Sequence, residues 1–337
     1  MNKPLVIAHR GASGHLPEHT LAGYALAMLQ GADFIEPDLV ATRDGVLVAR
    51  HENEIGGTTD VAAHDEFAAR RRTQLVDGVP VAGWFTEDFT LAELRTLRAR
   101  ERLPALRPGN ARHDGEFGIP TFDEILSLLS QVNAARRGQG LTLVGVYPET
   151  KHSSHFAGLG LALEAPLLAA LEAHGDGAPV FIQSFEMANL EALRARCAQP
   201  LVQLMQVEGG PWDRAGSGGF ERYAQLATPA GLREVARYAN AIGVQKEMVM
   251  AVDAAGRAVP TDLVRHAHEA GLAVHAWTFR AENHFLPPLL RRGIEAAGHG
   301  DLAAEVRMFA AAGVDGLFSD FPGLACEALA GAGVTKP

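Results

Sequence analysis

Hydrophobic residues in this chain gather in short runs separated by longer stretches of mixed character. The runs are mostly continuous rather than alternating, which is typical of parallel strands covered on both faces. The candidate strands are residues 5–8, 34–39, 142–147, 179–183, 201–205, 241–244, 273–277 and 315–319. Successive strands are far enough apart for a helix to fit between them.

Signals for helix ends lie between these runs. Thr90–Glu93 and Thr121–Glu124 have the capping-box pattern of a helix start. The stretches LQGADFIE, EAGLAVHA and AAGVDGLF each place a glycine where a helix should end and then enter a strand. A βα unit that recurs in this way predicts an α/β fold, the (β/α)8 TIM barrel, with a doubly wound open sheet as the alternative.

Residues 52–118 do not follow the βα alternation. They are long and mixed in pattern, and loops of that length are usually functional or separately folded. We predict that residues 1–337 form a single catalytic barrel domain in which 52–118 is an insertion after the second strand. This insertion is expected to lie over the C-terminal rim of the barrel.

Composition narrows the classes of partner. The chain carries 40 acidic and 30 basic residues, a net charge of −10, which argues against nucleic-acid binding. No run approaches the ~18 apolar residues of a membrane span, so we predict no stable membrane insertion. As written, the N-terminus shows no signal peptide and predicts a cytoplasmic protein; removal of a leader would make it periplasmic. Cys197 and Cys326 predict two free thiols, with a disulfide as the alternative.

Acidic residues stand at the ends of the second and third predicted strands, where barrel enzymes build their sites. Glu36 and Asp38 are two residues apart, so in a strand both side chains point to one face. Together with Glu149 in VYPETK they provide hard oxygen donors of the kind that Ca²⁺ and Mg²⁺ prefer. Salt bridges to Arg and Lys side chains are the alternative interpretation; the third carboxylate favours the metal site.

Histidines and positive charges lie beside these acids. His9 ends the first strand and His51 ends the strand-like GVLVARHE, so both are candidates for general acid and base. Arg10 and Lys151 offer positive charge, which fits a phosphate ester better than a neutral sugar. Glu18 is expected to orient Arg10 or a site histidine. His15, His19 and His275 are assigned scaffold roles.

Several of these motifs together resemble one known family. HRGASGHLPEHT is similar to the opening motif of the glycerophosphodiester phosphodiesterases, and FIEPDLVATRDGVLVARHE resembles their Glu-x-Asp metal motif followed by a His-Asp pair. VYPETK is similar to their third-strand glutamate and lysine, and the resemblance runs from about residue 5 to residue 330. It is strongest to the bacterial periplasmic type. This chain departs from the family pattern at His19, where asparagine is usual, and at Glu52, where aspartate is usual.

The resemblance implies a barrel enzyme for small-molecule substrates. Its expected reaction is metal-dependent hydrolysis of glycerophosphodiesters, such as glycerophosphocholine and glycerophosphoethanolamine, to sn-glycerol 3-phosphate and an alcohol. A divalent cation is implied, Ca²⁺ first and Mg²⁺ as the alternative. The implied residues are Glu36, Asp38 and Glu149 for the metal, His9 and His51 for catalysis, and Arg10, Lys151, Gln183, Trp277 and Phe279 for the substrate. A related phospholipase D-like or phosphoinositide-cleaving enzyme that acts on lipids is the alternative.

Overall fold

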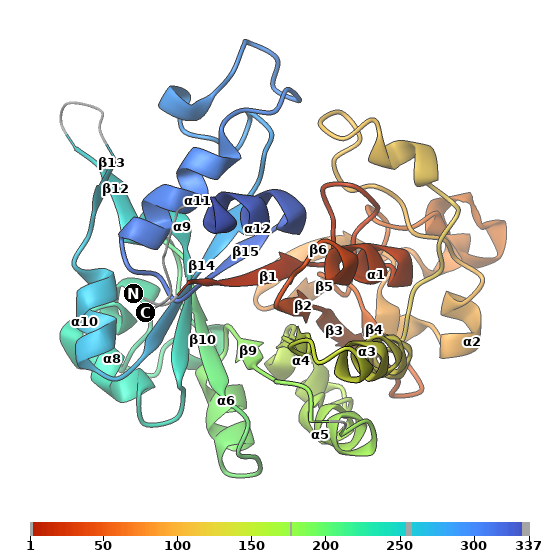
Figure 1. The fold of residues 1–337 in the computed structure, drawn as a ribbon. Coiled ribbons are helices and arrows are strands. Elements are labelled where there is room, and N and C mark those ends of the chain that lie inside the picture. Colours follow the sequence, from red (N-terminus) through yellow and green to blue (C-terminus); the bar gives the residue numbers. More distant parts are fainter. Residues whose placement is uncertain (1–2, 176, 254–257, 332–337) are drawn as a thin grey trace. The chain divides into compact units, whose positions relative to one another are not determined.

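A computed structural model describes residues 3–175, 177–253 and 258–331 of the chain. These residues form two compact units (Figure 1). The N-terminal unit comprises residues 8–29 and 33–180, and the C-terminal unit comprises residues 3–7, 30–32 and the described residues from 181 onward. The predicted acidic and histidine site residues therefore all belong to the N-terminal unit.

The N-terminal unit is built from helices and strands that follow one another in mixed order along the chain. They are α1 (Leu21–Leu29), β2 (Phe34–Glu36), β3 (Asp38–Ala41), β4 (Leu47–Ala49), β5 (Arg72–Val76), β6 (Val79–Gly83), α2 (Leu91–Leu94), α3 (Phe122–Gly138), β7 (Gly145–Val146), β8 (Glu149–Thr150), α4 (Ser153–Gly158) and α5 (Glu164–Ala173). Helices α1, α3 and α5 pack side by side, and α3 also contacts β4 and β7.

A parallel strand pair at the centre of this unit is interrupted in the middle. β2 pairs with β7 and β3 with β8. The Glu149 N–H donates to the Pro37 carbonyl at 2.9 Å, but Pro37 has no N–H to donate back, so one rung of the ladder cannot form. The predicted strand 34–39 is therefore divided at Pro37. The predicted strand 142–147 begins only at Gly145, so its first part was wrong.

Helix α3 anchors the start of the second strand of this pair. Its N-terminus has the predicted capping box, in which Thr121 and Glu124 satisfy each other's backbone N–H groups. Asn133, on its buried face, is fully shielded from solvent. The Asn133 amide accepts from the Val144 N–H and donates to the Val144 carbonyl, both at 2.9 Å. A side chain thus supplies the backbone partners that a neighbouring strand would give.

Residues 52–118 form a small folded region within the N-terminal unit. Strands β5 and β6 pair as an antiparallel hairpin, and α2 begins with the predicted capping box at Thr90. Phe85 and Phe89 are fully buried, and the Phe67 ring packs edge-on against Phe89 with centroids 5.0 Å apart. Its location over a barrel rim stays a prediction, as does the single-domain boundary.

The C-terminal unit repeats a strand-then-helix pattern (Figure 1). Its strands β9, β10, β11, β14 and β15 are parallel and hydrogen-bonded in that order, and β1 (Leu5–His9) lies beside β15. The main elements are β9 (Ile182–Ser184), α6 (Met187–Arg194), β10 (Leu201–Met205), α7 (Tyr223–Leu226), α8 (Pro229–Val235), β11 (Ala241–Gln245), α9 (Lys246–Val249), β12 (Met250–Val252), β13 (Ala258–Pro260), α10 (Leu263–Glu269), β14 (Ala273–Phe279), α11 (Leu302–Ala311), β15 (Gly316–Ser319) and α12 (Pro322–Ala330).

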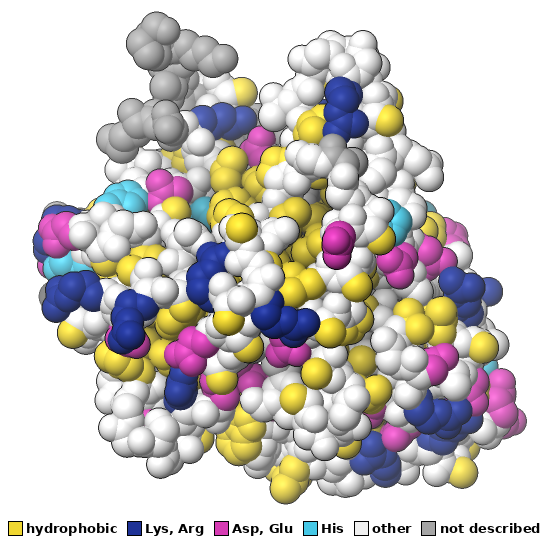
Figure 2. Space-filling view, turned by 90° about the horizontal axis from the view of Figure 1, so that it is seen from below, with side chains coloured by type: hydrophobic (Ala, Val, Ile, Leu, Met, Phe, Trp, Pro, Cys, Tyr) yellow, Lys and Arg dark blue, Asp and Glu magenta, His cyan; other side chains and the backbone are white. Residues whose placement is uncertain are grey.

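Helix ends in this unit follow the predicted glycine signal. Gly271 and Gly313 follow α10 and α11 with φ of 80° and 89°, a left-handed conformation that side chains other than glycine rarely adopt. Cys197 and Cys326 do not form a disulfide. No helix in the described part of the chain is both long and apolar enough to cross a membrane. On the face drawn in Figure 2, acidic and basic side chains are interspersed.

Candidate active site

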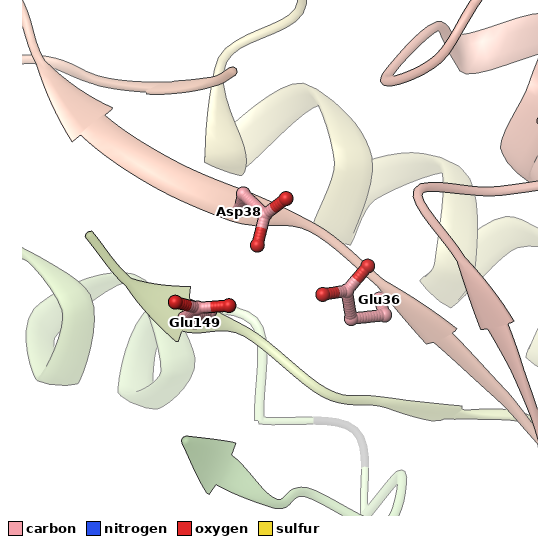
Figure 3. Close-up of side chains that lie close together, drawn as sticks. All are labelled: Glu36, Asp38 and Glu149. Carbon is pink, nitrogen blue, oxygen red and sulfur yellow. The ribbon is translucent and has the colours of Figure 1, made fainter. Parts of the chain in front are cut away.

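Three carboxylates from the central strand pair point toward one another (Figure 3). Glu36 and Asp38 lie on the same face because they are two residues apart, and Asp38 is paired directly with Glu149 across the parallel ladder. One oxygen of each lies within 4.8 Å of the others. The three side chains are almost fully buried, with residue exposures of 2%, 1% and 5% in the order Glu36, Asp38 and Glu149. Strand register alone therefore brings this acidic cluster together.

Ionising all three carboxylates of this buried cluster at once is unfavourable, because their negative charges lie close together and away from water. Burial and the Asp38 charge raise the pKa of Glu36 well above its usual range. Burial also raises the pKa of Glu149, to about 8, although Lys151 opposes the shift. Burial acts in the same direction on Asp38, but Lys151, His51 and His19 outweigh it and hold the pKa of Asp38 low. A divalent cation would relieve the repulsion that the first two shifts express.

Two positive side chains border the acidic cluster. The Arg10 backbone N–H donates to Glu36 Oε2 at 2.7 Å, and the Arg10 guanidinium Nε lies 3.4 Å from Asp38 Oδ2. Arg10 has φ of 60°, an unusual value for a residue other than glycine. Lys151 Nζ lies 2.8 Å from Glu149 Oε1. The structure thus brings both predicted phosphate-binding cations to the acids.

His19 supports the acidic cluster from behind. Its Nε2 lies 2.9 Å from Asp38 Oδ2 and its Nδ1 lies 2.7 Å from the Tyr24 hydroxyl, with both rings fully buried. This arrangement fixes the direction of the Asp38 carboxylate. Our sequence interpretation gave His19 only a scaffold role. The signal that we underused was the departure from asparagine at this position.

His51 follows β4, next to the strand that carries Asp38. The Arg50 N–H donates to the Asp38 carbonyl at 3.0 Å, which ties this segment to β3. His51 Nδ1 is hydrogen-bonded to Glu52 Oε1. Burial, reinforced by the charges of Arg10 and Lys151, lowers the pKa of His51 to about 3, so its imidazole is neutral near pH 7. His9 ends β1 and is largely buried, with its carbonyl accepting from Ser13 Oγ at 2.8 Å.

Arg102, from residues 52–118, meets two further carboxylates. Its NH2 lies 2.6 Å from Glu18 Oε1 and 2.7 Å from Glu52 Oε2. Glu18 Oε2 also accepts from Arg10 NH1 at 3.0 Å. Burial raises the pKa of Glu18, but Arg102 and Arg10 outweigh it and hold that pKa well below its usual range. The sequence contained no signal that would have singled out Arg102 among the arginines of this region.

Three predicted substrate residues lie in the C-terminal unit. Gln183 is on β9 and is buried, and Trp277 on β14 packs edge-on against Phe185 with ring centroids 6.0 Å apart. Phe279, also on β14, is fully buried and packs edge-on against Phe309 at 4.9 Å. Its surroundings are those of a core residue of this unit. The assignment of these three side chains to a glycerol pocket stays a prediction.

The acidic cluster fits a divalent cation by its chemistry. All three donors are carboxylate oxygens, the ligand type that hard cations take. Asp38 Oδ1 is buried, and within the described residues no N–H or hydroxyl group donates to it; Lys151 Nζ is 4.0 Å away. With flanking cations and histidines, this cluster could hold a divalent metal ion beside an anionic substrate.

Comparison with known proteins identifies the class more closely. Residues 9–324 match the Glycerophosphoryl diester phosphodiesterase family. A glycerophosphodiester phosphodiesterase of Arabidopsis thaliana is 35% identical over 96% of this chain and 85% of its own length, and one from Haemophilus influenzae is 28% identical over 97% and 90%. The chain belongs to the glycerophosphoryl diester phosphodiesterase family, and it is therefore a phosphodiester-hydrolysing enzyme.

Solved structures give the same fold. A putative glycerophosphoryl diester phosphodiesterase from Silicibacter pomeroyi has a TM-score of 0.69 and 23% identity, covering 99% of this chain and 95% of its own. A phosphodiesterase from Oleispira antarctica, solved with the product sn-glycerol-3-phosphate, has a TM-score of 0.63 and 21% identity, covering 97% of both chains. The predicted α/β fold of the (β/α)8 TIM-barrel type is thereby confirmed.

Proposed function

We propose that this chain hydrolyses soluble glycerophosphodiesters to sn-glycerol 3-phosphate and an alcohol at the site in the N-terminal unit. The observation that carries the proposal is the buried acidic cluster with Arg10 and Lys151 against it, in a member of this enzyme family. The Oleispira antarctica relative was solved with sn-glycerol-3-phosphate, which supports the same product here. Glycerophosphocholine and glycerophosphoethanolamine are the substrates we expect.

Glu36, Asp38 and Glu149 are the residues that would hold the divalent cation. When bound, the cation supplies Lewis-acid polarisation of a phosphate oxygen and neutralises charge that builds up on the way to the transition state. Ca²⁺ is our first choice because the sequence most resembles the periplasmic type, and three carboxylates on strands β2, β3 and β8 suit its adaptable coordination; Mg²⁺ is the alternative. His19 holds Asp38 in the direction that this role requires.

His51 and His9 share the proton transfers in our proposal. With Glu52 accepting the proton of Nδ1, the neutral His51 imidazole leaves Nε2 as an acceptor. We therefore assign His51 as the general base for the attacking oxygen, and His9 as the general acid that protonates the leaving alkoxide. Each transfer lets the substrate avoid a high-energy charged oxygen.

Arg10 and Lys151 are assigned to the phosphate. The planar Arg10 guanidinium can hold two phosphate oxygens at once, whereas Lys151 acts as a point charge. Glu18 orients Arg10 through the 3.0 Å contact with its NH1. The assignments of Gln183 and Trp277 to the glycerol moiety are part of this proposal, whereas the fully buried Phe279 is a core residue.

An assay for released glycerol 3-phosphate tests this function. Purified chain is given glycerophosphocholine, glycerophosphoethanolamine or vesicles of intact phosphatidylcholine, first with EDTA and then with Ca²⁺ or Mg²⁺ restored. We expect cation-dependent turnover of the two soluble diesters and loss of it in His9→Ala and His51→Ala. His174→Ala, on the same unit but bound to Asp123, is the matched control. Cleavage of the intact lipid frees no glycerol 3-phosphate, so it is followed by the release of choline or phosphocholine. Faster release from the vesicles than from the soluble diesters would favour the lipid-acting alternative and reject the proposal.

A further inference from the structure

The guanidinium of Arg102, in residues 52–118, contacts two carboxylates. Each of these carboxylates contacts one group of the proposed mechanism. Arg102 holds Glu18 through Nε at 2.8 Å and NH2 at 2.6 Å. It holds Glu52 through NH2 at 2.7 Å and NH1 at 3.2 Å. Glu18 contacts Arg10, and Glu52 contacts His51. The phosphate-binding side and the proton-transferring side of the site therefore meet at Arg102.

The segment that carries Arg102 is firmly attached to the loop after β1. Arg107 NH1 and the Asn110 amide both donate to the Ser13 carbonyl at 2.9 Å. The Asn110 amide also donates to Glu101 Oε2 at 3.0 Å, and Glu101 Oε1 accepts from the Leu103 N–H at 2.8 Å. The two residues that flank Arg102 are thus joined to the chain a few residues beyond Arg10. Arg102 is held at a defined place rather than reaching in from a loose loop.

Glu52 depends on Arg102 for its position. Its side chain is 37% exposed, so it could turn toward water. Within the described residues, the Glu52 carboxylate is hydrogen-bonded only to His51 and Arg102. Glu18, by contrast, is 7% exposed and is shared between Arg10 and Arg102. Without Arg102, the Glu52 side chain would keep only its hydrogen bond to His51, and the Glu18 side chain would be held by Arg10 alone.

We propose that Arg102 is a positioning residue that sets both the His51 imidazole and the Arg10 guanidinium at once. This inference rests on the proposed function, because it takes the roles of those two groups from it. It gives residues 52–118 a part in the reaction. An arginine suits this task because its planar fork can hold two carboxylates in fixed directions, which lysine cannot do.

A purely structural role for Arg102 predicts different kinetics. If Arg102 only tethered the inserted region, its loss would lower the folded fraction and hence the apparent kcat, with KM unchanged. If it positions both groups, Arg102→Ala should lower kcat about 10- to 100-fold and also raise KM severalfold. Glu52→Gln should reproduce mainly the change in kcat. Glu18→Gln should reproduce mainly the change in KM.

The decisive experiment is steady-state kinetics on glycerophosphocholine for the full-length chain and these variants. Arg102→Lys should recover part of both losses, and guanidinium ion at non-denaturing concentration should restore activity to Arg102→Ala. The double variant of Arg102→Ala with Glu52→Gln should be no slower than the worse single variant. Arg100→Met is the matched control, because Arg100 is 53% exposed and pairs only with Asp114 within the described residues.

Each outcome decides the matter. Values of kcat and KM within about twofold of wild type for Arg102→Ala would overturn the inference, as would a fall in kcat alone without rescue by guanidinium ion. If Arg102→Ala does not fold, Arg102→Lys decides through the same paired change in kcat and KM. An inactive wild-type chain would overturn the proposed function and this inference together, whereas an active wild type with unaffected Arg102 variants overturns the inference only.

Discussion

The two halves of the active site are held by different kinds of structure. The strand half consists of Glu36, Asp38 and Glu149. The loop half consists of Arg10, Glu18, His51, Glu52 and Arg102. Backbone hydrogen bonds of a parallel ladder place the first group, whereas the second group is placed by side chains that hold one another.

This difference determines how each half should respond to mutation. A strand keeps its shape when one side chain changes, so a substitution in the strand half removes a ligand and leaves the rest in place. In the loop half each charge is positioned by another charge, and loss of one partner shifts the next. We therefore expect large, isolated effects in the strand half and smaller, coupled effects in the loop half.

The largest expected effect is that of Asp38→Asn. This change removes the negative charge of the central carboxylate of the acidic cluster, so kcat/KM should fall on the order of a thousandfold or more. Kinetics with glycerophosphocholine at saturating Ca²⁺ measures it. Asp123→Asn, at a 64% exposed side chain on α3, is the control and should behave as wild type. Residual activity within tenfold of wild type would break the distinction between the halves.

A smaller effect is expected behind the ligands, at His19. His19→Ala removes the 2.9 Å contact to Asp38 Oδ2 but leaves all three carboxylates on their strands. The affinity for Ca²⁺ should therefore weaken by about 10- to 100-fold, with kcat largely regained when the cation is saturating. Titration calorimetry gives the affinity. A kcat that stays low at saturating cation would mean that His19 takes part in the chemistry itself.

The strand half should also make cation stabilisation depend on pH. Because the folded state raises the pKa of Glu149 to about 8, its contribution to stability is present below the unfolded value and is lost as pH rises through about 8. A bound cation offsets that loss by pairing the ionised carboxylate. The rise in Tm on adding Ca²⁺ should therefore be several degrees larger near pH 8.5 than near pH 6. Glu149→Gln should reduce the pH dependence and leave the part due to Glu36, whose pKa is also raised; an equal rise in Tm at both pH values in the wild type would contradict the prediction.

The smallest expected effect concerns the hydroxyl behind His19. Tyr24→Phe leaves the buried His19 Nδ1 without its partner at 2.7 Å and should lower the free energy of unfolding by about 1–3 kcal/mol. It should weaken Ca²⁺ binding severalfold at most. Urea unfolding and calorimetry measure the two changes. Tyr238→Phe, which removes a buried hydroxyl bonded to Gln203 in the C-terminal unit, should destabilise similarly without changing Ca²⁺ affinity.

The strand half could be read from the sequence because its geometry is local. A spacing of two residues puts Glu36 and Asp38 on one face of any strand, and a neighbouring parallel strand had to bring Glu149 beside them. The capping boxes of α2 and α3 are local for the same reason. The sequence also shows Pro37. Its effect on the ladder could not be predicted, however, because that effect depends on which edge of the strand is hydrogen-bonded to a neighbour.

The loop half could not be derived in this way. Arg102 and Glu18 are 84 residues apart, and only the folding of residues 52–118 brings them together. That region contains many arginines of similar local setting, among them Arg70 and Arg72, whose partners are Glu93 and Asp88. Sequence spacing cannot say which guanidinium turns toward the site. Tertiary contacts determine which arginine lies at the site, and such contacts produce no periodic pattern in the sequence.

The Asn133 amide on α3 has one more effect that bears on the metal site. The amide bonds to both the N–H and the carbonyl of Val144, so it fixes the position at which the following strand begins. Glu149 is five residues after Val144. The position of its carboxylate in the cluster therefore depends on the contact with α3 as well as on strand pairing. An aspartate at position 133 could accept from the Val144 N–H but could not donate to the Val144 carbonyl. The resulting shift of the strand would displace the Glu149 carboxylate, although Glu149 does not contact Asn133.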